Sequence, residues 1–329
     1  MSIIKGKAGI TAEILADSIS ESGVRLTTFV IEYPRIILAE LNTHRMLSKN
    51  SASSRAIPFK RMLEQLNGRP VRFGANQSGM QDKGEDYDVQ IRLEDENGSY
   101  FYTQLEVWEE AKDTATNFAK AFHEAGYHKQ VYNRFLEPFQ MMKTVISGTE
   151  WDNFFWLRDH DAADPSIAEL ARVMRIAREE SVPKLLMPSE WHLPYLWTMQ
   201  LEDGAIYGDW VDDLRFIEYS LQDAIKVSCA RCCAVSYRNK DYNLEKCLEV
   251  YERLVGDDRK HASALEHCAT PMKELFGGSG TSWNVNDHSN TDSWEEGISH
   301  ATRDGELWSG NFKGWIQHRK TIDGENHTL

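Results

Sequence analysis

The spacing of apolar residues predicts two strands and a short helix in the first part of the chain. Residues 10–33 read as two strands joined by a turn, because their second half is rich in β-branched residues that partly alternate with polar ones. The apolar run at 36–41 predicts a buried helix that ends near Arg45. Small polar residues then continue to Arg55, and we expect a loop there because Ser and Asn bond to nearby backbone rather than extend a helix.

From residue 100 onward the apolar period becomes helical, with an interruption before residue 210. Four helices are predicted, over residues 102–125, 165–180, 210–236 and 243–255. The segment 183–212 is rich in Pro and Trp and reads as an irregular connector. Two polar segments, 67–99 and 277–300, are predicted as loops, and the first is either a flap over a site or a plain surface loop.

Together these patterns predict an α+β fold in which long helices pack on a small, mostly antiparallel sheet. Residues 1–200 form the expected sheet and helix region, and residues 201–329 form the expected helical region. We expect the two to make one compact unit, because a chain of 329 residues suffices for one or two domains.

The net charge, the apolar runs and the cysteines of the chain limit which molecules it can be expected to bind. The formal net charge of −14 argues against duplex nucleic acid, which needs basic patches, but a single nucleotide needs only a few local Arg residues. No apolar run is long enough to span a bilayer and the first residues lack the apolar core of a signal peptide, so we expect no membrane contact and a cytoplasmic location. The five cysteines, three of them at 229–233 in a helical pattern, predict buried, inert thiols rather than disulfides or a metal site.

The polar segment after the first predicted helix carries the strongest candidate chemistry. Glu40, His44 and Ser48 recur every four residues and would share one helix face. Arg45 and Arg55 add two guanidiniums, whose planar fork binds phosphate oxygens in pairs. The segment is therefore either an anion-binding site or a solvated helix end at which cations offset the helix dipole.

The stretch from Thr43 to Arg55 resembles the signature of the flavin-dependent thymidylate synthases, R-H-R-x-x-S-x-N-E-x-S-x-R. The His, the second Arg, both Ser, the Asn and the final Arg are present. The first Arg of the signature is replaced by Thr43, and its Glu is replaced by Ser51.

Other segments resemble further motifs of this family. In the family an Arg comes shortly before a buried Leu-Pro, and here Arg134 comes shortly before Pro138. Residues 153–158 match the family pattern N-x-x-x-L-R. Residues 230–237 resemble A-A-R-V-S-Y, and residues 261–267 resemble G-H-x-S/T-x-x-E-H.

The order of these motifs differs from the family pattern. The motifs at residues 230–237 and 261–267 open the chain in the family but come late here. A second His-Arg pair, His318-Arg319, follows them. We therefore expect a circularly permuted or internally duplicated relative. The sequence leaves open whether this pair or His44-Arg45 meets the flavin.

The resemblance implies an enzyme, a flavin-dependent methyltransferase that converts dUMP to dTMP with FAD, NADPH and methylenetetrahydrofolate. It implies substrate contacts for Glu40, Ser53, Arg55, Arg134 and Arg158, of which Ser53, Arg55 and Arg158 take part in catalysis. It implies cofactor contacts for His44, Arg45, Ser48, Asn50, Asn153, Ser236, His261, Ser263, Glu266, His318 and Arg319. It also implies a homo-oligomer, a tetramer or a dimer, with sites between subunits.

The departures from the family pattern define the alternatives. Thr43, Ser51 and Glu40, which stands where the family has Gln, lie at the end of the site that would face the base. An ionised Glu only accepts hydrogen bonds, which favours the amino group of cytosine over the carbonyl of uracil. The alternative reaction is hydroxymethylation of dUMP or dCMP, and the alternative from another class is a relative that binds nucleotide or flavin without catalysis.

Overall fold

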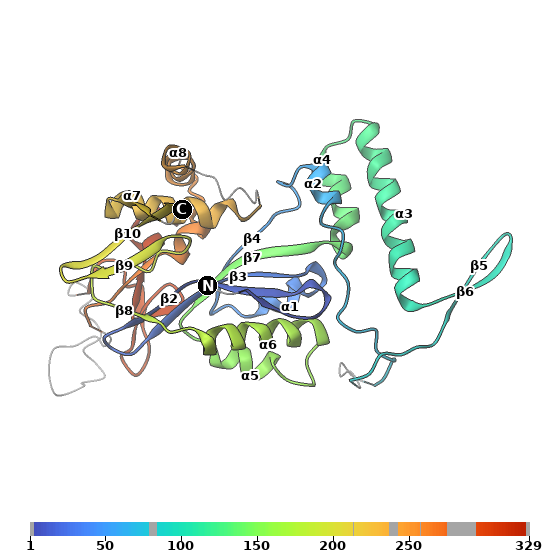
Figure 1. The fold of residues 1–329 in the computed structure, drawn as a ribbon, viewed down its shortest axis with the longest axis horizontal. Helices are drawn as coiled ribbons and strands as arrows, with labels where there is room; N and C mark the ends of the chain where they lie inside the picture. Colours follow the sequence, from blue (N-terminus) through green and yellow to red (C-terminus); the bar gives the residue numbers. More distant parts are fainter. Residues whose placement is uncertain are drawn as a thin grey trace.

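The fold is mixed α/β and is built around one six-stranded sheet (Figure 1). This computed structural model describes residues 3–78, 84–212, 214–236, 243–256, 258–274 and 294–326. Five strands pair antiparallel in the order β1 (Ile4–Lys5), β2 (Thr11–Ser20), β3 (Arg25–Pro34), β7 (Met141–Gly148) and β4 (Ser48–Ser51). The short strand β8 (Lys184–Leu186) pairs parallel with β2. The expected mixed fold with a small, mainly antiparallel sheet is confirmed.

The two strands predicted within residues 10–33 are present as β2 and β3. The apolar run after them forms η2 (Arg35–Ile37) and α1 (Leu38–Thr43), as predicted. The prediction of a loop after α1 is wrong over residues 48–51. These four residues form β4, which pairs with β7. The edge of β7 satisfies backbone groups of β4, and this outweighs the low strand propensity of Ser and Asn.

Two helices cover one face of the sheet (Figure 1). They are α5 (Asp152–Arg158) and α6 (Pro165–Glu180), and α6 matches its predicted bounds. Phe29 and Ile146 point to this face and join Leu170 of α6 in one apolar cluster. The side chain of Asp164 caps α6 by accepting the amide hydrogens of its first turn.

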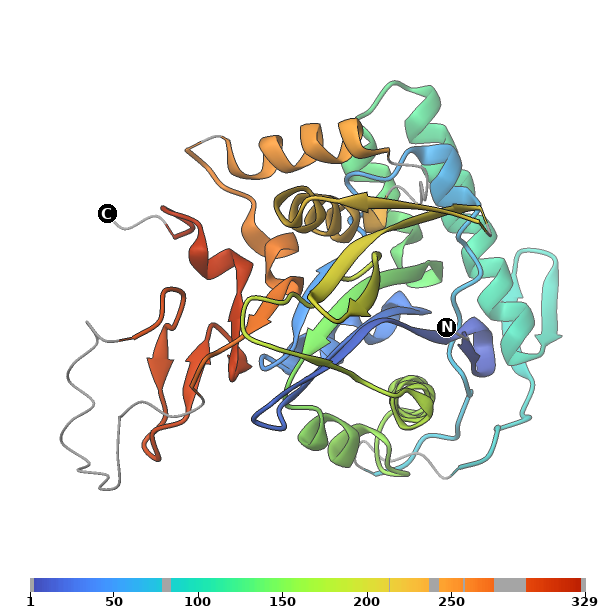
Figure 2. The same ribbon diagram turned by 60° about the vertical axis from the view of Figure 1, so that its left-hand side comes forward.

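A second helical layer covers the other face (Figure 2). It contains α7 (Leu221–Cys233), η4 (Ala234–Ser236), α8 (Leu244–Val255) and η5 (Ala262–His267). Val145 of β7 packs with Ala230 and Leu265 in this layer. Cys229 and Cys232 are fully buried here, and burial raises the pKa of both thiols, as expected for inert cysteines. The described residues contain no cluster of metal-binding side chains.

Two predictions for this part of the chain are wrong. Residues 183–212 are not an irregular connector, and no helix begins at residue 210. The chain instead forms a three-stranded antiparallel sheet of β9 (Trp197–Leu201), β10 (Gly204–Asp212) and β11 (Arg215–Tyr219). Gly204 follows an Asp and takes a φ of +125°, which makes the tight turn between β9 and β10. The helix begins only after Ser220, whose side chain caps α7.

An arm that contains the longest helix stands away from the sheet (Figure 1). Its elements are α2 (Phe59–Leu63), β5 (Ile91–Asp95), β6 (Gly98–Tyr102), α3 (Gln104–Glu124), α4 (Lys129–Tyr132) and η3 (Asn133–Phe139). The helix α3 was predicted, and a capping box between Thr103 and Glu106 fixes its start. The loop predicted at 67–99 is wrong over its last part, where β5 and the start of β6 form a hairpin that continues to Tyr102. None of the described helices is both long and apolar enough to cross a membrane.

The C-terminal segment adds small strands beside η5. These are β12 (Ala269–Pro271), β13 (His300–Ala301), β14 (Leu307–Ser309), β15 (Phe312–Lys313) and β16 (Trp315–Gln317), followed by η7 (His318–Thr321). Most of the loop predicted at 277–300 lies outside the described residues, as does Tyr237.

Two histidines are enclosed between the sheet and the second helical layer. His192 is 1% exposed and His267 is 0% exposed, and burial lowers the pKa of each to about 3. Both rings are therefore neutral at pH 7, whereas histidines of the unfolded chain protonate below pH 6.5.

We predict that the protein loses stability as the pH falls from 6.5 toward 3. Over this range the unfolded chain binds protons that the folded chain does not, so each histidine removes about 1.4 kcal/mol of unfolding free energy per pH unit. Urea unfolding at a series of pH values measures the slope. A flat profile between pH 6.5 and 4 would contradict the assignment.

Candidate functional site

A pocket at the start of β4 brings together residues from both ends of the chain. Its volume is about 440 Å³. It is lined by Asn42, Arg45, Leu47, Ser48, Lys49, Glu266, Gly310, Asn311, Gln317, Arg319 and Lys320. Four of the sequence-predicted cofactor residues, Arg45, Ser48, Glu266 and Arg319, therefore lie around one pocket.

Both predicted His-Arg pairs reach this pocket, and each does so through its arginine. Arg45 is exposed, and its side chain has no hydrogen-bond or ion-pair partner among the described residues. Arg319 is held by two carboxylates, because its Nη1 lies 2.5 Å from Glu266 and its Nε lies 2.6 Å from Glu325. Arg45 is thus free to bind an anion, while Arg319 is largely neutralised by its partners.

The two histidines of these pairs are buried beside the pocket rather than in its lining. Nε2 of His44 accepts a hydrogen bond of 2.8 Å from Nε of Arg158. Burial, and then the Arg158 charge, lower the pKa of His44 to about 4. His318 bonds to the Tyr251 hydroxyl at 2.8 Å, and burial lowers its pKa to about 4 as well. Both rings are neutral at pH 7.

Lys49 is the main pocket residue that the sequence reasoning missed. Its ammonium donates to the carbonyl oxygens of His44 and Leu47 at 2.5 and 2.8 Å. Burial lowers the pKa of Lys49 to about 8, and the carboxylate of Glu266 partly offsets this effect. Its position between Ser48 and Asn50 of the motif was a variable one in the family signature, so only its charge marked it.

The pocket has an excess of positive charge in a chain of formal net charge −14. Its cations are Arg45, Lys49, Arg319 and Lys320, and the carboxylates that face them are Glu266 and Glu325. Amide and hydroxyl groups complete the lining, with Gln317 and Ser48 both bonded to Asn311. This set of donors suits a polar anion such as a phosphate or diphosphate.

Two more predicted residues meet next to the pocket. Asn50 donates from Nδ2 to the Cys232 carbonyl at 2.6 Å, and its Oδ1 accepts from the Ser263 hydroxyl at 3.5 Å. Strand β4 is thereby joined to α7 and η5. Ser236 ends η4, and His261 is exposed at the start of η5, so both lie in the same helical layer.

Three predicted residues lie on the other side of the sheet. Asn153 is exposed on α5, and Arg158 ends that helix beside His44. Glu40 lies in α1, and its Oε2 atom is buried without a hydrogen-bond partner among the described residues. A buried carboxylate oxygen without a donor is costly, so Oε2 of Glu40 is an acceptor whose hydrogen-bonding capacity is not used among the described residues.

The remaining predicted residues form a separate group at the base of the arm. Ser53 and Arg55 follow β4, and Arg134 lies in η3; all three are exposed. Asn133 joins these segments, because its Nδ2 donates to the Ser54 carbonyl at 2.8 Å. Within one protomer Arg158 does not join Arg55 and Arg134, because it lies beside His44, before β4, whereas they lie beyond the end of β4.

The residues present fit one part of FAD. The cations and amides around the pocket suit the diphosphate and the polyol chain, and a volume of about 440 Å³ accommodates a group of that size. Leu47 is the one large apolar side chain among the lining residues, so the pocket of a single protomer offers no aromatic wall for the isoalloxazine ring.

Comparison with known proteins adds no assignment. No family model matches the chain, and a search of curated proteins finds no match.

We predict that the same substitution lowers stability at one arginine of this pocket and leaves it nearly unchanged at the other. Arg319→Gln should lower the unfolding free energy by about 2 kcal/mol, because it removes charge-assisted hydrogen bonds to Glu266 and Glu325 and leaves Glu266 without its ion-pair partner, while Glu325 keeps Lys320. Arg45→Gln should change it by less than about 0.5 kcal/mol, because the side chain is exposed and unpaired. Urea unfolding of both variants tests the pocket geometry, and equal losses would contradict it.

Proposed function

We propose that this protein is a flavin-dependent enzyme that transfers a one-carbon unit to C5 of a pyrimidine deoxynucleotide, converting dUMP to dTMP. The observation that supports this most is the convergence of His44-Arg45 and His318-Arg319, which are far apart in sequence, on one positively charged pocket. In this proposal the chain is a rearranged relative of the flavin-dependent thymidylate synthases, with their α+β fold. Four residues that the resemblance marks as cofactor contacts, Arg45, Ser48, Glu266 and Arg319, line this pocket.

In the proposed enzyme the pocket binds the polar part of FAD. Arg45 and Lys49 bind the diphosphate, and Nδ2 of Asn311, whose Oδ1 accepts from Gln317 and Ser48, donates a further hydrogen bond to it. When bound, the flavin supplies the hydride chemistry that links NADPH to the carbon carried by methylenetetrahydrofolate. His44 accepts from Arg158 through Nε2, so its Nδ1 carries the proton and is a neutral donor.

The nucleotide is proposed to bind between protomers. Ser53, Arg55 and Arg134 present a hydroxyl and two guanidiniums on an exposed surface, which suits the dianionic phosphate of a nucleotide. In one protomer this surface is separated from the pocket by the length of β4. A dimer or tetramer in which it faces the pocket of a neighbour would complete the site.

We predict that the purified protein binds FAD and that Arg45→Gln weakens this binding about 10-fold or more, because one charge-assisted hydrogen bond is lost. Fluorescence titration of FAD measures the change. Arg69→Gln is the matched control, because Arg69 is exposed and does not line the pocket. A wild-type protein that takes up no FAD would reject the flavin enzyme and leave a non-catalytic nucleotide-binding protein as the alternative.

A second reaction is favoured by one observation, the unpartnered Oε2 of Glu40. An acceptor at this position would select the amino group of cytosine, which favours dCMP as the nucleotide of the alternative hydroxymethylation. Incubation of the protein with methylenetetrahydrofolate and either dUMP or dCMP, followed by mass measurement of the product, separates the two reactions.

We predict that Glu40→Gln shifts the preference from dCMP toward dUMP, because an amide can also donate to the uracil carbonyl. The ratio of product formed from an equimolar mixture of the two nucleotides measures the shift. Asp164→Asn is the control: it makes the same carboxylate-to-amide change at a residue that caps α6. An unchanged ratio would remove Glu40 from the base contact.

A further inference from the structure

Five hydrogen-bonded side chains form a continuous chain across the central sheet. In order they are Ser18 of β2, His192, Thr28 of β3, Ser147 of β7 and His267 of η5. The successive donor–acceptor distances are 2.9, 2.8, 2.6 and 2.8 Å. Every member is at most 5% exposed. We call this set the hydroxyl–imidazole chain.

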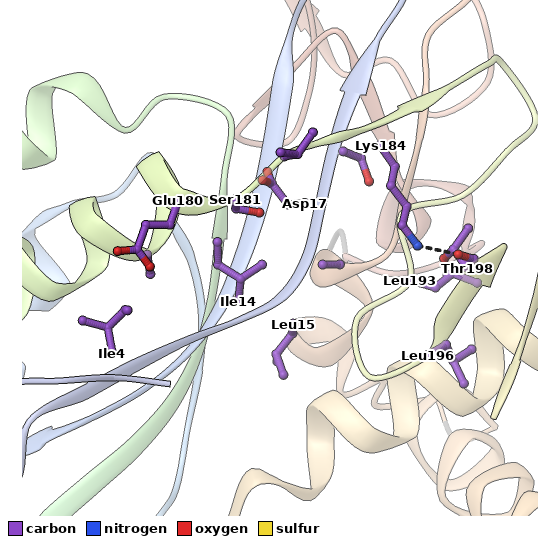
Figure 3. A pocket seen from close by; sticks show the side chains of 14 residues that line it. Ile4, Ile14, Leu15, Asp17, Glu180, Ser181, Lys184, Leu193, Leu196 and Thr198 are labelled. Atoms are coloured by element: carbon purple, nitrogen blue, oxygen red, sulfur yellow. Dashed lines mark hydrogen bonds between the residues drawn. The ribbon is translucent and has the colours of Figure 1, made fainter. Parts of the chain in front are cut away.

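Each end of the hydroxyl–imidazole chain has a distinct environment. Ser18 lines a pocket of about 290 Å³ between β2, β8 and the end of α6, and Figure 3 shows Asp17, Ser181 and Lys184 around it. At the opposite end, Nε2 of His267 is buried and has no hydrogen-bond partner among the described residues. One terminus therefore meets a pocket, and the other is a buried, unpaired ring nitrogen on the residue that follows Glu266 of the candidate site in sequence.

The chemistry of the members allows only two hydrogen-bonding directions. Each hydroxyl donates one hydrogen and accepts another, and each neutral imidazole donates from one nitrogen and accepts at the other. If Ser18 donates to His192, then both imidazoles carry the proton on Nε2. If His192 donates to Ser18, then both carry it on Nδ1. The two histidines must share one tautomer, although three hydrogen bonds lie between them.

We propose that the hydroxyl–imidazole chain is a proton relay between the pocket beside Ser18 and the η5 segment that carries Glu266. Burial keeps both imidazoles neutral at pH 7, so the relay works through tautomers and not through a stable imidazolium. The inference concerns residues outside the proposed nucleotide and flavin contacts and holds whether or not that function is correct.

The transfer of one proton along the hydroxyl–imidazole chain conserves the number of protons on its members. A local opening of the η5 segment has to bring water or a protonated group to the buried Nε2 of His267, which then takes up a proton while the Nδ1 proton of that ring moves to Ser147. Ser147 passes its hydrogen to Thr28, Thr28 passes its own to Nε2 of His192, and the Nδ1 proton of His192 moves to Ser18. Ser18 releases its hydrogen to water or a ligand oxygen in the pocket. One proton enters, one leaves, and the direction of every bond is reversed.

The resting direction follows from the unpaired, buried nitrogen Nε2 of His267. An unpaired buried N–H donor is rarer in proteins than an unpaired acceptor. The resting state therefore has both histidines protonated on Nδ1, with the lone pair of His267 Nε2 unpaired and the Ser18 hydroxyl directed to its pocket.

Histidine tautomers in the full-length protein test the relay. Two-bond ¹H–¹⁵N correlations at pH 7, assigned with His192→Gln and His267→Gln, should show both rings neutral and predominantly protonated on Nδ1. Ser18→Ala removes the acceptor for the His192 Nδ1 proton. It should raise the fraction of His267 protonated on Nε2 severalfold, although the two residues do not touch.

Ser20→Ala is the matched control, because Ser20 lies on the same strand and is also buried, and among the described residues its side chain bonds only to Ser22 and Val24. It should leave both tautomers unchanged. Opposite tautomers for His192 and His267 in the wild-type protein would overturn the relay, and this measurement does not depend on the folding of the Ser18 variant. A folded Ser18 variant with an unchanged His267 would overturn it as well.

Discussion

The pairing of β7 along both of its edges is the constraint on which the rest of this structure depends. The strand pairs with β3 over eight residues and with β4 over four. Its alternating side chains serve the two helical layers, with Val145 on one face and Ile146 on the other. Ser147 continues the first face and bonds to Thr28 and His267. A shift of β7 by one residue would exchange these faces and place hydroxyls in one apolar core and branched side chains against the histidines.

The sequence predicted the elements whose apolar period is strong and whose ends carry local signals. The helix α6 begins at Pro165 after the capping Asp164, and both features are visible in the sequence. The strand β4 was not visible, because Ser48 to Ser51 form a strand through their hydrogen bonds to β7 and not through their own propensity. The strands β9 and β10 were missed for a different reason. The turn at Gly204 that joins them was interpreted as part of an irregular segment.

Part of the candidate site was predictable because its residues come in short motifs. Arg45, Ser48, Glu266 and Arg319 were selected from such motifs and lie around one pocket. Lys49, Asn311 and Gln317 were not, because residues that only complete a lining are specified by the three-dimensional approach of β4 to the C-terminal segment. The sequence also could not give the pairing of Arg319 with two carboxylates, since Glu266 and Glu325 reach it from separate segments.

The position of β4 at the edge of the sheet explains how residues from both faces reach one place. Successive side chains of a strand point to opposite faces, so Asn50 bonds to the α7 layer while Lys49 bonds to the carbonyls before β4, beside α5. In a central strand the two sets would be separated by the sheet, whereas around an edge strand they are separated only by the strand itself. A cofactor bound at this edge would contact both helical layers. It could therefore meet motif residues that are far apart in the sequence.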